Sequence, residues 1–290
     1  MRLLLLIVCL MALACQSEPR IGESSDASRP RILSLSPHAT QMLAEFEVLD
    51  DVVGVTDFCP LPEDHANIPR VGGLMNPNVE RMLSLRPSVV FHAPTVNGPQ
   101  ERLAAAGIRV VPLANESLAD VYSGIEIMGR ELGMEDRAAD LVARSREELE
   151  ALQEELADAA RPSVLFVIGH APGSLRDIHA AGPDTFLDEL ITIAGGSNHM
   201  ANAPTRYPVV SRESLIQHPP DLVIMAAPTG GWSDGEQEQL RAQWRTLLGN
   251  AGQAVRVEFL DSPELTIPGP LVHRSARLLA LLMHPSIAKD

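Results

Sequence analysis

The sequence has little positive charge, few aromatic residues and few cysteines. Lys and Arg total 23 against 38 Asp and Glu, which gives a formal net charge of −15. This balance argues against a nucleic-acid-binding role, because phosphate contacts require basic stripes on the surface. Aromatic residues make up 3% of the chain. Any ring that stacks on a ligand must therefore come from a short set of Phe, Tyr and Trp positions.

Several catalytic and nucleotide-binding motifs are also absent. The chain has neither a G-x-S-x-G sequence nor a Walker A or G-x-G-x-x-G sequence. The stretch APGSLRD, residues 171–177, lacks the second glycine of a nucleophile elbow. Any ATP hydrolysis coupled to this protein must therefore come from another chain. We expect the protein not to be an enzyme and to carry no cofactor of its own.

The first residues predict export from the cytoplasm. MRLLLLIVCLMALAC has one Arg followed by an apolar run that is too short to span a bilayer as a mature helix. It matches a secretory signal peptide over residues 1–14. Cys15 stands where a bacterial lipoprotein is cleaved and acylated, although Ala12-Leu13-Ala14 also satisfies the rule for ordinary signal cleavage. The prediction is a periplasmic protein with a lipid anchor in a membrane, followed by a flexible tether over 15–29.

The three cysteines do not predict a disulfide-stabilised fold. Cys9 leaves with the signal peptide, and acylation of Cys15 leaves Cys59 without a partner. We expect Cys59 to be a small buried hydrophobic side chain.

From Pro30 onward, short apolar strands alternate with amphipathic helices, which predicts parallel sheets covered by helices. The first helix is expected over 37–49, with Thr40 helping to cap it, and a later one with Pro183 and Asp184 at its start. The chain is helical from 117 to 160 with a break at Gly133, and its heptad pattern is too short for a coiled coil. The fold class is α/β. The expected lobes cover 30–116 and 162–290, joined by helices within 117–161.

One helix–proline–strand pattern occurs twice. NVERMLSLRPSVVF begins at Asn78 and SRESLIQHPPDLVI begins at Ser211. Both copies have a glutamate third, apolar residues fifth and sixth, and a proline tenth. The prediction is one helix–strand unit in each lobe, with Glu80 and Glu213 at equivalent positions on the same side.

Ligands of α/β sheets bind beyond the carboxyl ends of the strands, so residues that follow strands are the candidate ligand contacts. They are His38, Phe58, Leu74, Met75, His92, His170, Tyr207, Trp232 and Glu264, and Arg206 is added as the one Arg close to a pocket candidate. Tyr207 and Trp232 suit stacking on a flat ring, whereas Trp244 is expected in the core of a helix. The histidines lack the close spacing of a metal site, so no metal site is predicted.

The chain resembles the periplasmic substrate-binding proteins of ABC importers for cobalamin, iron-siderophores and haem. The phrases that carry the resemblance are PRILSLSPHATQML, VVGVTDFC, PRVGGLMNPNVERMLSLRPSVV, TFLDELITIAGGSN and YPVVSRESLIQHPPDLVI. The resemblance implies a class III periplasmic binding protein, in which two Rossmann-like lobes joined by a single long helix hold the ligand between them. It also implies that Glu80 and Glu213 dock on arginines of a membrane permease, which works with a separate ATPase. A monomer is expected.

The resemblance is strongest to cobalamin-binding members, which implies a corrinoid ligand. This chain departs from them in two places. They have a Trp at the position of Tyr207, and a basic segment where residues 262–270, SPELTIPGP, contain no Arg. Haem and an iron-siderophore stay open as ligands. Two other functions stay open as well: a chelatase-type enzyme that acts on metal macrocycles, and a surface adhesion lipoprotein that has the same fold.

Overall fold

The computed structural model describes residues 29–73, 76–95, 98–226, 231–249, 254–260 and 266–289. Four of the predicted functional residues lie outside these ranges: Cys15, Leu74, Met75 and Glu264. The signal peptide and all but residue 29 of the predicted tether lie outside them as well.

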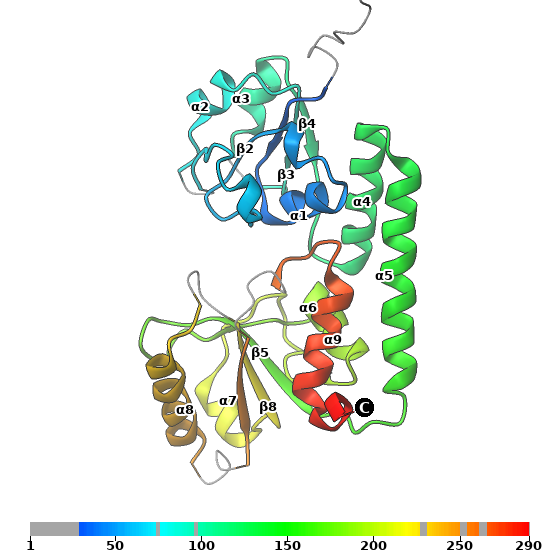
Figure 1. Ribbon diagram of the computed structural model, residues 1–290. Coiled ribbons are helices and arrows are strands. Elements are labelled where there is room, and N and C mark those ends of the chain that lie inside the picture. Colours follow the sequence, from blue (N-terminus) through cyan, green and yellow to red (C-terminus); the bar gives the residue numbers. More distant parts are fainter. Residues whose placement is uncertain are drawn as a thin grey trace, which may run out of the picture.

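The first sheet is built from the N-terminal third of the chain and is fully parallel (Figure 1). Its spatial order is β2-β1-β3-β4. The strands are β1 (Ile32–Ser34), β2 (Val52–Val55), β3 (Val89–His92) and β4 (Arg109–Pro112). The helices of this region are α1 (Pro37–Glu45), α2 (Val79–Ser84) and α3 (Gln100–Ala105). We call this unit the N lobe.

The second sheet repeats that order as β6-β5-β8-β9, with β7 pairing on β5. Its strands are β5 (Ser163–Gly169), β6 (His179–Ala180), β7 (Ser197–Asn198), β8 (Leu222–Ala226) and β9 (Arg256–Leu260). Its helices are α6 (Phe186–Ile193), α7 (Arg212–Gln217), α8 (Asp234–Leu248) and α9 (Val272–Met283). We call this unit the C lobe. The expectation of parallel pairing holds except at β6, a two-residue edge strand that pairs antiparallel with β5.

A helical hairpin lies beside both lobes (Figure 1). It consists of α4 (Leu118–Leu132) and α5 (Glu135–Glu155). Gly133 ends α4 with a φ of 68°, a left-handed conformation that glycine adopts without steric cost. The predicted apolar face of α5 is confirmed, since its members are all buried: Ala138, Leu141, Val142, Leu149 and Leu152.

Polar contacts attach α5 to each lobe in turn. Near its start, Arg137 donates from Nε and Nη2 to the carbonyl oxygen of Glu45 at the end of α1, at 2.9 and 2.7 Å. Near its end, Glu155 forms a 2.7 Å ion pair with Arg277 of α9. The 21-residue helix therefore acts as a strut between the lobes.

The repeated sequence folds as one unit used twice. Its first residues, Asn78 and Ser211, are the N-caps of α2 and α7, and each side chain accepts a backbone N–H three residues on. The strands β3 and β8 begin at the same position of the repeat and lie at the same place in their sheets. The fifth residues are 1% and 0% exposed, which explains why both are apolar: Met82 and Leu215.

Two predicted helix starts differ from the structure. Thr40 does not cap α1: its hydroxyl donates to the carbonyl of Ser36, one turn earlier. The N-cap of α6 is Thr185 instead of Pro183 or Asp184, because its hydroxyl accepts the N–H of Asp188.

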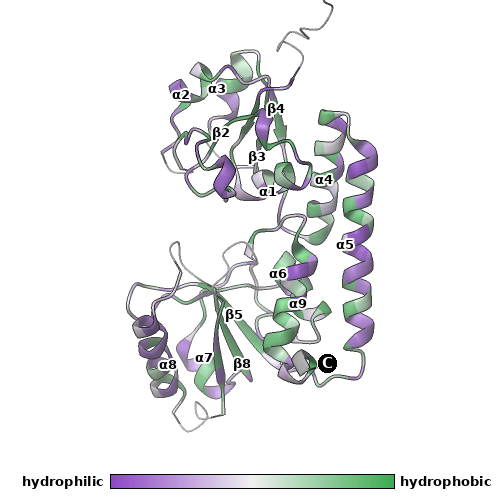
Figure 2. Ribbon diagram, in the orientation of Figure 1, coloured by the Kyte–Doolittle hydropathy of each residue, from purple (hydrophilic) through white to green (hydrophobic). Residues whose placement is uncertain are grey.

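Apolar residues concentrate on the strands and on the inward faces of the helices (Figure 2). Trp244 is 1% exposed and Cys59 is a buried free thiol, as predicted for both. Within the described ranges, no helix is both long and apolar enough to cross a membrane.

Candidate functional site

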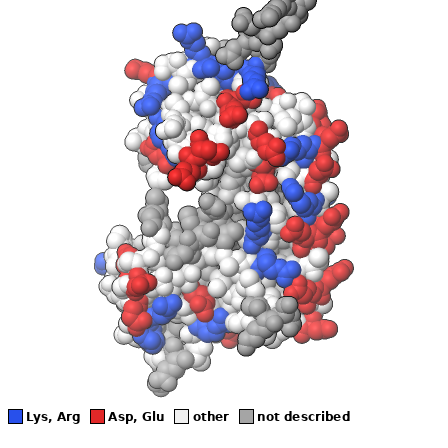
Figure 3. All heavy atoms as spheres, in the orientation of Figure 1, with Lys and Arg blue, Asp and Glu red and all other residues white. Residues whose placement is uncertain are grey.

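The carboxyl ends of the parallel strands in the two lobes face each other. In Figure 1, β1 runs from the N-terminal tail toward the C lobe, while β5 runs back from the end of α5 toward the N lobe. Figure 3 shows the surface hollowed between the lobes, on the side away from α4 and α5. This edge of each sheet is where α/β folds place their ligands.

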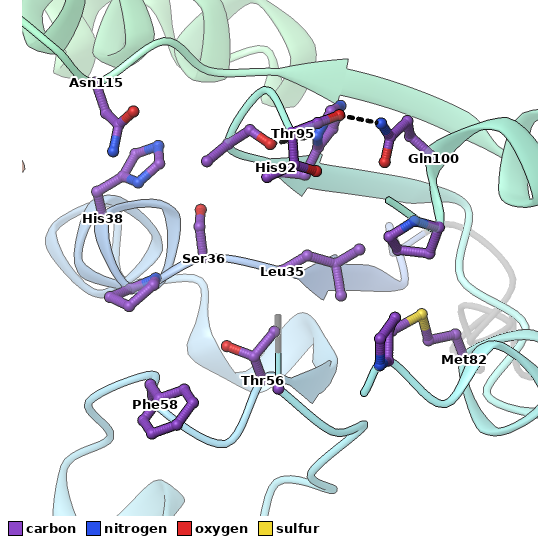
Figure 4. A pocket seen from close by; sticks show the side chains of 15 residues that line it. Leu35, Ser36, His38, Thr56, Phe58, Met82, His92, Thr95, Gln100 and Asn115 are labelled. Atoms are coloured by element: carbon purple, nitrogen blue, oxygen red, sulfur yellow. Dashed lines mark hydrogen bonds between the residues drawn. The ribbon is translucent and has the colours of Figure 1, made fainter. Parts of the chain in front are cut away.

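A pocket of about 240 Å³ opens at the carboxyl edge of the N-lobe sheet (Figure 4). It is smaller than the roughly 300–1,000 Å³ typical of complete small-molecule sites, so it has room for only part of a ligand of ordinary size. Three predicted ligand contacts line it: His38, Phe58 and His92. The other lining side chains with polar groups are Ser36, Thr56, Thr95, Gln100 and Asn115. We call this cavity the N-lobe pocket.

His38 is held uncharged inside the N-lobe pocket. Its side chain lies on α1, the residue is 2% exposed, and its Nε2 is 3.2 Å from the carbonyl oxygen of Leu113. Burial lowers the pKa of His38 from 6.5 to about 4, with a smaller contribution from nearby His92. Because a carbonyl only accepts, Nε2 carries the proton, and Nδ1 is left as the acceptor nitrogen of the neutral ring.

Ser36 precedes α1 and faces the pocket. Serine at an N-cap ordinarily accepts a helix N–H, but the Ser36 side chain makes no such bond. The residue is 4% exposed, and among the described residues its hydroxyl has no hydrogen-bond partner. In Figure 4 the hydroxyl points into the space between His38 and His92.

Other parts of the pocket wall are held by hydrogen bonds from side chains to backbone carbonyl oxygens. His92 donates from Nδ1 to the carbonyl of Ala93 at 2.7 Å, which leaves Nε2 as its acceptor. Arg70 donates from Nη1 to the carbonyls of Thr56 and Cys59, both at 2.8 Å. These bonds hold the loop that presents Phe58, whose side chain is exposed although it is large and apolar.

The C lobe contributes a row of side chains joined by contacts between rings. The rings of His170 and Trp232 are nearly parallel, with centroids 6.3 Å apart. Trp232 also contacts Phe259 edge-on, with ring centroids 5.2 Å apart. Arg241 lies over the ring of Phe259, with its guanidinium carbon 4.7 Å from the ring centroid. Two of the predicted ligand contacts, His170 and Trp232, are therefore neighbours in the structure. His170 follows β5, Trp232 follows β8, and both are half-buried.

Tyr207 and Arg206 lie apart from that row, on an exposed loop before α7. The Tyr207 hydroxyl donates to the carboxylate of Glu116 at 2.9 Å. Burial raises the pKa of Tyr207 to about 12, and the Glu116 carboxylate adds to the effect. Glu116 also accepts the N–H of Phe186 on its carbonyl, so the segment between β4 and α4 is bonded to the C lobe.

Glu80 and Glu213 are exposed at the second position of α2 and of α7. The pKa of Glu213 is lowered by its own backbone N–H and by the Ser211 hydroxyl, which donates to it at 2.9 Å. A carboxylate in the first turn of a helix is favoured by the N-terminal N–H groups. In Figure 1 both helices lie to the left of the α4–α5 hairpin.

Across the part of the chain that the structure describes, no group of three or more His, Cys, Asp or Glu residues is arranged to hold a metal ion. The geometry instead offers an apolar pocket with a few polar groups in one lobe and an aromatic row in the other. Such a pair of surfaces suits a bulky ligand between two lobes.

Comparison with known proteins places this arrangement in a family. A family model described as periplasmic binding protein matches residues 32–263. The chain belongs to the periplasmic binding protein family. It is 28% identical to an uncharacterized ABC transporter substrate-binding lipoprotein of Bacillus subtilis, over 90% of this chain and 82% of that one. It is 33% identical to a cobalamin-binding protein of Halobacterium salinarum, over 69% of this chain but only 54% of that protein.

Solved periplasmic binding proteins have the same fold. The periplasmic haem-binding protein of Pseudomonas aeruginosa superposes with a TM-score of 0.77 at 25% identity, covering 89% of this chain and 93% of that one. The vitamin B12-binding protein of Vibrio cholerae superposes with a TM-score of 0.71 at 19% identity, covering 90% and 98%. The predicted class III fold is confirmed.

Sequence reasoning did not identify every residue of this periplasmic binding protein's pocket. It missed the polar lining residues other than the two histidines: Ser36, Thr56, Thr95, Gln100 and Asn115. Asn115 follows β4, so the rule applied to the other strands would have found it. Ser36 stands between a strand and Pro37, where a serine is ordinarily a helix N-cap, so its position in the sequence does not indicate a ligand contact.

Proposed function

We propose that the protein is the extracytoplasmic solute-binding subunit of an ABC importer, and that it holds a corrinoid such as cobalamin between its lobes. The observation that carries the proposal is the pairing of two unlike surfaces at facing sheet edges. The N-lobe pocket is largely apolar, and in the C lobe the half-buried rings of His170 and Trp232 stack on each other beyond the carboxyl ends of β5 and β8. A flat macrocycle with a polar rim would use both. The cobalamin-binding name of the Halobacterium relative supports the same ligand.

In this proposal Glu80 and Glu213 dock on a membrane permease. Each is an exposed carboxylate at the same position of a repeated unit, one in each lobe. Two charges at a fixed separation orient an encounter and speed it more than they increase affinity. The permease would work with a separate ATPase chain, and an acylated Cys15 would hold the protein at the membrane surface.

The test is a titration of the purified protein with cyanocobalamin, haemin and a ferric siderophore. Binding is followed by ligand absorbance and by Trp fluorescence, because the chain has only two tryptophans and Trp232 lies in the proposed site. Saturable one-to-one binding of cyanocobalamin is the expected result. If none of the three chelates binds, the solute-binding proposal is wrong, and the chelatase and adhesion alternatives take its place.

Haem is the second candidate ligand, and one observation favours it. His92 leaves Nε2 as an acceptor and His38 leaves Nδ1, and imidazole nitrogens of this kind can ligate iron. Haemin binding with a Soret shift that disappears in His92→Ala would favour haem over the corrinoid.

A further inference from the structure

The N-lobe pocket contains hydrogen-bonding groups that the protein itself does not use. Ser36 is 4% exposed, and its buried hydroxyl has no hydrogen-bond partner among the described residues. Buried polar groups of native proteins are nearly always paired, so an unpaired one that faces a pocket indicates a partner from outside the chain. That Ser36 stands at an N-cap but does not cap strengthens the point.

The polarity of these groups defines what they can bind. Ser36 can donate through its hydroxyl, whereas neutral His38 can only accept at Nδ1, because its Nε2–H is already given to Leu113. His92 offers a second acceptor at Nε2, because its Nδ1–H is given to Ala93. A ligand group that satisfies this set must carry both an acceptor oxygen and a donor N–H or O–H.

The charge of the pocket narrows the choice further. The described lining residues include no Asp, Glu, Lys or Arg. A carboxylate placed here would lose its hydration without gaining a cation, and it would meet the lone pair of His38. An ammonium group would likewise find no carboxylate. An uncharged group avoids both penalties.

We propose that the N-lobe pocket is a subsite for an uncharged primary carboxamide on the rim of the ligand, which accepts from Ser36 Oγ and donates to His38 Nδ1. This inference rests on the proposed function and narrows its substrate class. The corrin ring of cobalamin carries primary carboxamides on its rim, whereas haem carries carboxylates. The subsite therefore selects amide-bearing chelates over carboxylate-bearing ones.

The experiment compares cyanocobalamin with its monocarboxylic acid derivatives, in each of which one rim amide is hydrolysed. Dissociation constants are measured by calorimetry at neutral pH on the wild-type protein, Ser36→Ala and His38→Leu. Ser145→Ala serves as the matched control, because Ser145 is also buried but lies on α5, away from the pocket lining. We expect about tenfold weaker cyanocobalamin binding in Ser36→Ala and no change in the control.

The ligand series tests the inference even if a variant folds poorly. At least one monocarboxylic derivative is expected to bind wild-type protein about tenfold or more weakly, and Ser36→Ala should reduce that preference. If cyanocobalamin binds and neither the amide hydrolysis nor Ser36→Ala matters, the subsite is wrong while the importer proposal stands. If haemin binds tighter than cyanocobalamin, the amide preference is likewise wrong. If no chelate binds, both proposals are overturned.

Discussion

The hydroxyl of Tyr207 lies 2.9 Å from the carboxylate of Glu116, 91 positions earlier in the chain. Glu116 belongs to the short segment between β4 and α4, so the bond joins the loop before α7 to the chain leaving the N-lobe sheet. It also fixes the direction of the Tyr207 ring, which is 41% exposed and is one of the predicted ligand contacts. The order of that side chain therefore depends on a residue that the sequence did not single out.

This bond predicts a change in tyrosine titration. Burial and the Glu116 carboxylate raise the pKa of Tyr207 to about 12, so the bond is fully present below pH 10 and is lost as pH rises through 12. The chain has only two tyrosines, so tyrosinate absorbance resolves them well. Glu116→Gln removes the charge and is expected to move one transition to lower pH. An unchanged titration curve would show that the pair is not formed in solution.

The docking prediction concerns Glu80 and Glu213. The double variant Glu80→Ala, Glu213→Ala is expected to abolish ligand uptake in cells and to leave the dissociation constant of the purified protein unchanged. The reason is that both carboxylates are exposed on short helices outside the N-lobe pocket lining. Glu126→Ala, which removes another exposed glutamate from α4, is the matched control. Normal uptake by the double variant would refute the docking role.

Much of this fold follows from local sequence patterns. The repeat at Asn78 and Ser211 predicted two equivalent helix–strand units, because a buried fifth residue and a helix-ending proline are local requirements. The rule that ligands bind beyond the carboxyl ends of strands selected His38, Phe58 and His92 as candidates, and the structure places all three in the lining of one pocket. Tyr207–Glu116 and Arg137–Glu45 could not be found in this way, since they join segments whose approach depends on how the lobes pack. The antiparallel β6 was missed because two residues carry no periodicity.

If α5 acts as a strut, removing its contact with the N lobe should lower the free energy of unfolding. Arg137 donates twice to the carbonyl of Glu45 and once to the Glu47 carboxylate. Arg137→Ala is expected to lower the free energy of unfolding by about 1–3 kcal/mol, because it leaves a helix-end carbonyl without its donor. Arg102→Ala, at an exposed position of α3, should change the free energy of unfolding by less than about 0.5 kcal/mol. Urea unfolding followed by circular dichroism measures both, and equal effects would argue against the strut.

His38 predicts how stability depends on pH. Its folded pKa of about 4 lies below the ordinary 6.5, so the unfolded chain binds the extra proton first. Stability is therefore fully present above pH 6.5 and falls as pH drops toward 4, by on the order of 3 kcal/mol for this group. His38→Gln should flatten this dependence. His199 and His273, whose pKa values are also lowered by burial, remain in the variant and cancel in the comparison. An identical pH profile in the variant would mean that His38 is not buried as a neutral ring.

Substitution by alanine is expected to destabilise the protein much less at Ser36 than at Ser117. Both are N-caps, but Ser117 accepts the N–H of Asp120 within a capping box, whereas Ser36 makes no cap bond. Ser117→Ala should cost about 1 kcal/mol of unfolding free energy, and Ser36→Ala only a few tenths. Thermal and urea unfolding of the two variants provide the measurement. A large loss at Ser36 would mean that its hydroxyl is used within the protein, and the amide subsite would then lose its donor. If Ser36→Ala loses little unfolding free energy but binds the ligand more weakly, the Ser36 hydroxyl serves ligand binding and not the stability of the fold.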